Sequence, residues 1–255
     1  MNPPPVAATI TGSSLLDAPE MVPIRASETV ARFGPTLIVA PHPDDESLGC
    51  GGALALLARW RQPVKVVFVT DGAASHPNSL EYAAPRLGDL RESEARQALA
   101  SLGVGGDAAV FLRAPDGRLD ELSAAESARV RQRCCSEVDA FQPHVVITPW
   151  RREAHPDHRA ATALVRGVLR RVRSRARLLE YPVWAWEQGD HPRLGEFPAW
   201  RLDISAVVRA KAAAIASHRS QLTPLIADDP AGFRLTDETL AYFRRPWELY
   251  LETDA

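Results

Sequence analysis

Short apolar runs alternate along this chain with longer segments whose apolar residues recur at helical spacing. The runs are rich in β-branched residues and predict strands, whereas the longer segments predict helices. The predicted strands cover residues 37–40, 64–70, 109–112, 144–148, 177–181 and 247–252. The predicted helices cover residues 53–60, 89–102, 124–141, 157–173 and 205–220. Because this alternation is typical of βαβ units, we expect an α/β fold with a mostly parallel sheet flanked by helices.

The pattern also indicates how the chain is organised. Residues 1–30 are rich in Pro and Ala with weak periodicity, and we expect an N-terminal arm there. Residues 31–255 show no internal repeat and no convincing linker, so a single domain is expected. Past residue 182 the pattern is irregular and holds four of the six tryptophans. The Trp-rich segment 182–200 is expected to form one wall of a pocket.

Composition and charge argue against several classes of protein. The formal net charge of -2 gives no reason to expect nucleic acid as a partner. The Arg-rich stretch 166–177 has no interleaved aromatic residues for base stacking. The three cysteines, at positions 50, 134 and 135, form no disulfide framework. We find no signal peptide and no run of about 18 apolar residues that predicts a membrane span, so a cytoplasmic protein is expected. The oligomeric state stays open, with a homo-oligomer as one option.

The residues with chemical potential gather in two similar motifs, HPDDE at residues 42–46 and HPDH at residues 155–158. Each motif comes after a predicted strand, as does the loop that opens with Asp71 and Gly72. Ligands of open α/β sheets bind at the carboxyl ends of the strands. We therefore expect the three segments to converge at one edge of the sheet.

Three side chains from the two motifs form a ligand set for a divalent metal. A catalytic zinc keeps three protein ligands and one open position. His42, Asp45 and His158 supply such a set. Imidazole and carboxylate ligands suit zinc, although iron, cobalt or nickel accept the same donors. We therefore expect one Zn²⁺ per chain.

The other polar residues of the motifs have expected roles around the metal. Asp44 is the expected general base for an attacking water, because it cannot readily share the metal with its neighbour. His155 lies three residues before His158 and is expected to stabilise an oxyanion or to protonate a leaving amine. Asp157 is expected to hold one of these imidazoles in the right tautomer. For Glu46 two interpretations stay open, favouring the start of a helix or touching the site.

The two motifs, with three further elements, resemble the LmbE-like (PIG-L) family of zinc-dependent deacetylases. The resemblance rests on VAPHPDDESLGCGG at residues 39–52, TDG at 70–72, Arg91 and Glu94, HPDH at 155–158 and HRSQ at 218–221. It implies a Rossmann-like fold, the ligands and catalytic roles given above, and removal of an N-acyl group from an N-acetylglucosamine-type sugar or its conjugate. Some members have a tyrosine where this chain has Glu153, which puts an acid role for a tyrosine in doubt.

The residues that contact the substrate are assigned less directly by the resemblance than the metal ligands are. Arg91, with Asp116 behind it, is the expected contact for sugar hydroxyls. The structural alternative is a salt bridge between Arg91 and Glu94. His218 is expected beside the metal ligands without binding the metal, and a packed core histidine is its alternative.

A small N-acyl amino sugar is thus the expected substrate, and rival functions stay open. Within the same class, the chain could be a metal-dependent amidase of a thiol–sugar conjugate. The same ligands could serve a metal-dependent phosphoesterase, but two-metal phosphoesterases usually need more carboxylates, and Asp71 is the only obvious extra one. A binding module that kept the metal and lost turnover is a third option, which the intact Asp44 and His155 disfavour.

Overall fold

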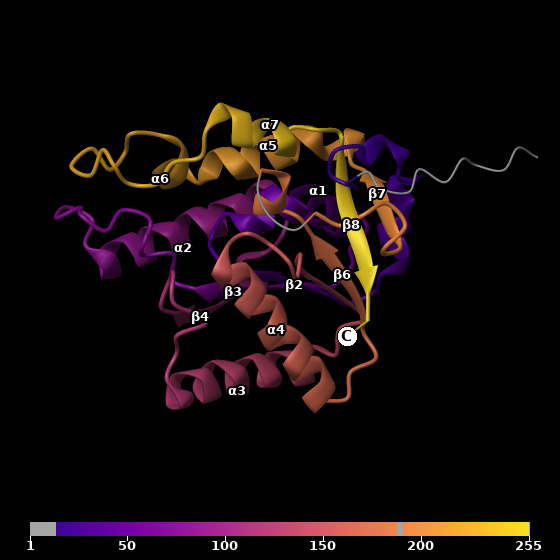
Figure 1. The fold of residues 1–255 in the computed structure, drawn as a ribbon, viewed down its shortest axis with the longest axis horizontal. Helices are drawn as coiled ribbons and strands as arrows, with labels where there is room; N and C mark the ends of the chain where they lie inside the picture. The colour runs from indigo at the N-terminus through magenta and orange to yellow at the C-terminus, as the bar shows by residue number, and fades with distance from the viewer. Residues whose placement is uncertain (1–13, 188–190, 255) are drawn as a thin grey trace, which may run out of the picture.

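A sheet of eight strands runs through the part of the chain that the computed structural model describes, residues 14–187 and 191–254 (Figure 1). The strands are β1 (Ile24–Arg25), β2 (Thr36–Ala40), β3 (Val64–Thr70), β4 (Ala109–Ala114), β5 (Val145–Pro149), β6 (Arg177–Tyr181), β7 (Ala199–Asp203) and β8 (Trp247–Thr253). Their order across the sheet is β1-β7-β8-β6-β5-β2-β3-β4. All neighbours are parallel except β8, which runs antiparallel to β6 and β7. The predicted α/β fold with a mostly parallel sheet is confirmed.

Helices cover both faces of this sheet, as Figure 1 shows. They are α1 (Asp45–Arg59), α2 (Ala84–Ser101), α3 (Ala124–Phe141), α4 (Pro156–Arg171), α5 (Val208–Ser217), α6 (Arg219–Leu222) and α7 (Asp237–Phe243). Short 3-10 helices are η1 (Pro19–Met21), η2 (Ser27–Arg32), η3 (Gly106–Ala108), η4 (Trp184–Trp186) and η5 (Ser205–Val207). On one face α3 packs against α4, and on the other α5 contacts both α1 and α2. Within the described residues, no helix is long and apolar enough to cross a membrane.

The central strands are mostly apolar because helices cover both of their faces. In β2, Leu37 and Val39 belong to the core cluster on the side of α3 and α4. Ile38 and Ala40 belong to the cluster on the side of α1. All four side chains are fully buried. Side chains of a strand point alternately to its two faces, so a strand with two covered faces reads as a continuous apolar run.

The helix α1 begins earlier than the sequence pattern indicated. It starts at Asp45 rather than at residue 53, so the predicted start was wrong. The glycines of this stretch are helical and serve close packing. A Cβ at Gly49 would lie 2.1 Å from the ring of Tyr181, and a Cβ at Gly52 would lie 2.5 Å from Ile204. The end of the HPDDE motif is therefore the first turn of a helix that packs tightly on its neighbours.

The other differences fall mainly in the C-terminal part of the chain. The helix predicted over 205–220 is divided into η5, α5 and α6, because the backbone at His218 leaves the helical region (φ -82°, ψ 59°). Neither β7 nor α7 was predicted. Strand β1, within the segment expected to form an arm, pairs in parallel with β7. In contrast, the elements predicted at 64–70, 124–141 and 177–181 match the structure residue for residue.

Candidate metal centre and active site

Two neighbouring strands bring the two motifs together. Strands β2 and β5 are paired in parallel, so their carboxyl ends lie at the same edge of the sheet. There the chain enters α1 and α4, whose N-caps are Asp44 and His155. Pro156 occupies the first turn of α4, where its missing N–H costs nothing. Both motifs therefore lie at the positive ends of helices, which favour carboxylates and other electron-rich groups.

Three donor atoms from the motifs face one another in a buried cluster. Asp45 Oδ2 lies 3.2 Å from His42 Nδ1 and 3.2 Å from His158 Nε2. One donor atom from each of the three residues lies within 4.8 Å of the others. Burial alone would raise the pKa of Asp45, but the two histidines lower it well below its ordinary value. The cluster therefore favours an ionised carboxylate between two imidazoles.

His158 shows that this cluster fits a metal ion. The side chain is fully buried. Its Nε2 lies 3.2 Å from Asp45 and its Nδ1 3.6 Å from Glu153, but neither nitrogen makes a well-formed hydrogen bond with the described residues. Buried polar atoms are seldom left in this way, and those that are require an explanation. A cation between His158 Nε2 and the other two donors would satisfy one of these nitrogens.

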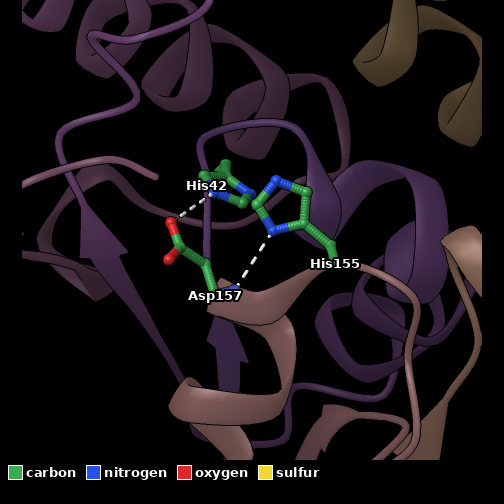
Figure 2. Close-up of side chains that lie close together, drawn as sticks. All are labelled: His42, His155 and Asp157. Atoms are coloured by element: carbon green, nitrogen blue, oxygen red, sulfur yellow. Dashed lines mark hydrogen bonds and ion pairs between the residues drawn. The ribbon is translucent and has the colours of Figure 1, made fainter. Parts of the chain in front are cut away.

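The second nitrogen of His42 faces two further carboxylates. His42 Nε2 lies 3.1 Å from Asp116 Oδ1 and 3.2 Å from Asp157 Oδ2, the latter drawn in Figure 2. Burial lowers the pKa of His42, but the carboxylates more than offset this and raise it well above its ordinary value. They place the proton of a neutral imidazole on Nε2 and leave Nδ1 free to bind a metal.

These carboxylates are themselves held by backbone N–H groups. Asp157 accepts hydrogen bonds from Gly117 N at 2.7 Å and Leu119 N at 3.0 Å, and Asp116 accepts one from Ala74 N at 2.9 Å. The structure thus places Asp157 beside an imidazole. It places Asp116, expected to contact sugar hydroxyls, against His42 as well as along the cavity described below.

His42, His155 and Asp157 form a second group with metal-ligand spacing. Here, however, His155 Nδ1 already accepts a hydrogen bond from Asp157 N at 3.2 Å, as Figure 2 shows. This contact leaves the proton of neutral His155 on Nε2. Burial lowers the pKa of His155 to about 4, and the nearby His42 and His158 add to this. The group that contains His158, whose nitrogens make no well-formed hydrogen bond, is therefore the better metal site.

Asp44 lies beside the cluster in an unusual backbone conformation. Its φ of 153° falls in a region that L residues rarely adopt. Its Oδ2 lies 3.1 Å from Arg91 Nη2, and Arg91 also donates to the carbonyl oxygens of Gly72 and Pro43, both at 2.8 Å. Burial raises the pKa of Asp44 to about 6, against the attraction of Arg91. Arg91 therefore holds the carboxylate and its loop, and it also lines the cavity.

A second hydrogen-bond network supports the first turn of α1. Glu46 Oε2 accepts from Asp44 N at 3.0 Å, and Glu46 Oε1 lies 3.1 Å from His218 Nε2. Burial lowers the pKa of His218, but Glu46 outweighs this and raises it. Glu94, the expected alternative partner of Arg91, instead accepts from Ser220 N at 2.8 Å and from its hydroxyl at 2.6 Å. Glu46 thus holds the backbone of Asp44, and His218 in turn holds Glu46.

A cavity of about 580 Å³ opens above these groups. Its lining includes His42, Asp44, Asp45, Arg91, Asp116 and His155 together with Ser75, Trp184, Gln221 and Phe233. Trp184 and Phe233 meet edge to face with ring centroids 5.7 Å apart. Of the expected Trp-rich wall, Trp184 lines the cavity, whereas Trp186 stacks on Tyr242 outside it. Phe233 had no sequence signal, since it lies in a loop without periodicity.

Comparisons with known proteins agree with this architecture. The family model described as PIG-L, GlcNAc-PI de-N-acetylase, matches residues 37–169, just over half of the 255 residues. The 1D-myo-inositol 2-acetamido-2-deoxy-alpha-D-glucopyranoside deacetylase of Mycobacterium sp. (strain KMS) is 37% identical over 163 residues. That match covers 54% of this chain and 51% of the relative, so the chain spans about half of that relative's length.

Solved structures share the fold. The N,N'-diacetylchitobiose deacetylase of Pyrococcus horikoshii has a TM-score of 0.62 at 22% identity, over 84% of this chain and 75% of that one. The 4-carboxy-2-hydroxymuconate hydratase GalB of Pseudomonas putida KT2440 has a TM-score of 0.59 at 19% identity, over 83% of both chains. At such identities the likeness shows the fold alone. The family match, by contrast, covers both HPD motifs and confirms the resemblance seen in the sequence. The chain therefore belongs to the PIG-L family.

Proposed function

We propose that this protein is a zinc-dependent deacetylase that removes the N-acetyl group from a small amino-sugar conjugate. The observation that carries the proposal is the buried cluster of His158, Asp45 and His42: neither nitrogen of His158 makes a well-formed hydrogen bond, and Asp45 and His42 line a cavity. Asp44 and His155 line the same cavity and have no place in that ligand set. Metal-assisted amide hydrolysis requires a general base and a hydrogen-bond donor close to the metal but not bound to it.

The proposed ligands are His42 Nδ1, Asp45 Oδ2 and His158 Nε2. Two imidazoles and one carboxylate, with no thiolate, suit zinc in a catalytic site. A divalent metal held there supplies a Lewis acid that polarises the amide carbonyl and lowers the pKa of water.

Asp44 is the proposed general base. With a pKa of about 6, its carboxylate is ionised at neutral pH and still basic enough to take a proton from the attacking water. Arg91 holds one oxygen at 3.1 Å, and Glu46 holds the backbone N–H of the same residue. The carboxylate is therefore aimed before the substrate arrives, which spares the reaction the cost of orienting it.

His155 is the proposed donor to the reacting carbonyl. Its Nδ1 is occupied by the N–H of Asp157, so the neutral ring presents Nε2–H as its donor. The low pKa of His155 keeps the ring neutral at pH 7. A neutral imidazole can donate a hydrogen bond to the oxyanion that develops as water adds to the amide.

The substrate class follows from the cavity and the relatives together. A volume of about 580 Å³ is of the size that small-molecule sites have in proteins. Trp184 and Phe233 offer apolar faces, while Asp116 and Gln221 offer polar groups. The mycobacterial relative is a deacetylase of an N-acetylglucosamine–inositol conjugate. We carry over that class, a 2-acetamido sugar joined to a polar group, without the identity of the second group.

The phosphoesterase alternative gains no support from the structure. Its extra carboxylate would be Asp71, whose Oδ1 accepts a hydrogen bond from Ala73 N at 3.0 Å. Asp71 is not among the described residues that line the cavity. An amidase of a thiol–sugar conjugate would use the same groups and differs in the bond that it cleaves.

Acetate release tests the proposal. Zinc-loaded protein would be incubated with N-acetylglucosamine, its inositol and aryl glycosides, acetylated peptides, a thiol–sugar amide and a phosphodiester. We expect acetate from the sugar conjugates, and loss of that activity after chelation and in Asp44→Asn. Turnover of peptides or phosphodiesters with inert sugars would refute the substrate class. Cleavage of the thiol–sugar amide without acetate would favour the amidase.

A further inference from the structure

Glu153 is a buried carboxylate between His158 of the metal cluster and the backbone at residues 183–185. It lies in the turn between β5 and α4 and is 1% exposed. Its Oε1 accepts a hydrogen bond from Val183 N and its Oε2 one from Trp184 N, each at 2.7 Å. Ala185 N adds a longer contact at 3.4 Å. The side chain therefore fixes the turn that carries Trp184, one of the aromatic residues lining the cavity.

The same carboxylate faces the metal cluster. Its Oε2 lies 3.6 Å from His158 Nδ1, beyond hydrogen-bond distance but close for a pair shielded from water. His158 Nε2 points the other way, toward Asp45 at 3.2 Å. A histidine that binds a metal through Nε2 must carry its proton on Nδ1. Glu153 is the anion placed to favour that tautomer.

We propose that Glu153 is a positioning residue that couples metal binding to the shape of the cavity. One of its oxygens lies beside both the His158 ring and the N–H of Trp184, so the orientation of His158 and the position of the Trp184 turn depend on the same group. The inference rests on the proposed function, since it takes the cluster to bind zinc. Outer groups that orient a metal-binding histidine typically contribute about 10–100-fold to metal affinity.

A zinc titration with a matched control tests the first half of the coupling. Zinc affinity would be measured by competition with a chromophoric chelator for the wild type, Glu153→Gln and Glu248→Gln. Glu248 is also a buried carboxylate that accepts two backbone N–H groups, from Gly52 at 2.6 Å and Ala53 at 2.8 Å. Its charged partner is Lys211 rather than a histidine.

We expect zinc to bind Glu153→Gln about 10–100-fold more weakly than the wild type, and Glu248→Gln with unchanged affinity. A role limited to holding the fold would lower the unfolding midpoint of both variants and leave both zinc affinities unchanged. Wild-type affinity in Glu153→Gln would therefore overturn the inference while leaving the proposed function intact. A wild-type protein that binds no zinc would overturn both.

Hydrogen exchange tests the second half of the coupling, and its comparison of the wild type with and without zinc does not depend on any variant folding. In the wild type, zinc should slow exchange of the amides at residues 183–185. A metal that holds the His158 ring in place also holds Glu153, which accepts hydrogen bonds from these N–H groups. Glu248→Gln should show the same slowing, and Glu153→Gln should lose it. If zinc binds the wild type and exchange at 183–185 does not change, the coupling is refuted.

Discussion

Replacing Asp44 with Asn should make the protein more stable and abolish most of the proposed activity. Asn keeps the size and shape of Asp, so the strain of the 153° φ at this position is common to both residues. Its amide oxygen can still accept from Arg91, which lies 3.1 Å away. The substitution therefore removes the charge and the basicity while disturbing the loop little.

The gain in stability follows from the raised pKa of Asp44. Burial shifts the pKa from 3.8 to about 6 even though Arg91 opposes the shift. Between these values the folded protein holds a proton that the unfolded chain has lost, so stability falls as the pH rises from about 4 to 6. The full difference is about 3 kcal/mol and persists above pH 6. Asn resembles the protonated acid and avoids this loss.

The measurements are urea denaturation of chelator-treated protein at pH 5 and pH 8, and acetate release by zinc-loaded protein. At pH 8 we expect the free energy of unfolding of Asp44→Asn to exceed that of the wild type by up to about 3 kcal/mol. At pH 5 this excess should be smaller by about 1.4 kcal/mol. The same variant should lose about 10²–10⁴-fold in kcat with its zinc content unchanged, as expected for a missing general base.

Asp45→Asn is the matched control. Its carboxylate is equally buried, but His158 and His42 lower its pKa well below the ordinary value, so Asn should destabilise the chelated protein at pH 8. Stability of Asp44→Asn equal to the wild type at both pH values would refute the desolvation argument. Loss of zinc from Asp44→Asn would show that Asp44 is a ligand, and retained turnover would show that it is not the base.

Three further substitutions test other parts of the structure. His158→Ala should remove most bound zinc, measured by elemental analysis, because two ligands from one loop hold a metal poorly; undiminished zinc would refute the ligand set. His155→Ala should lower kcat by about 10²–10³-fold with little change in KM or zinc, as expected for an oxyanion donor, whereas a raised KM at unchanged kcat would limit it to binding. Gly49→Ala should lower the free energy of unfolding, measured by urea denaturation, by about 1–3 kcal/mol or more, because its Cβ would lie 2.1 Å from the Tyr181 ring. Wild-type stability would contradict the tight packing of α1.

The sequence alone determined six of the eight strands of the sheet and the place of the chemistry. Strands β3 and β6 and helix α3 were predicted with their observed bounds, because burial on two faces or on one helical stripe leaves a periodic signal. The two HPD motifs follow β2 and β5, so the parallel pairing of these strands was enough to bring the motifs together. The family was also recognisable from these local motifs.

Only the tertiary structure decided how the surroundings of the site are arranged. The glycines of α1 fell outside the predicted helix, which began at residue 53. In the structure they are helical, and the absence of a Cβ lets α1 pack closely against Tyr181 and Ile204. Asp116 meets His42, and Glu153 meets the turn at Trp184, across gaps that have no period in the sequence. Helix and strand periodicity record which face of an element is buried, which is a local property. Which two distant side chains meet depends on strand order and on loop paths, and those are decided by how the whole chain packs.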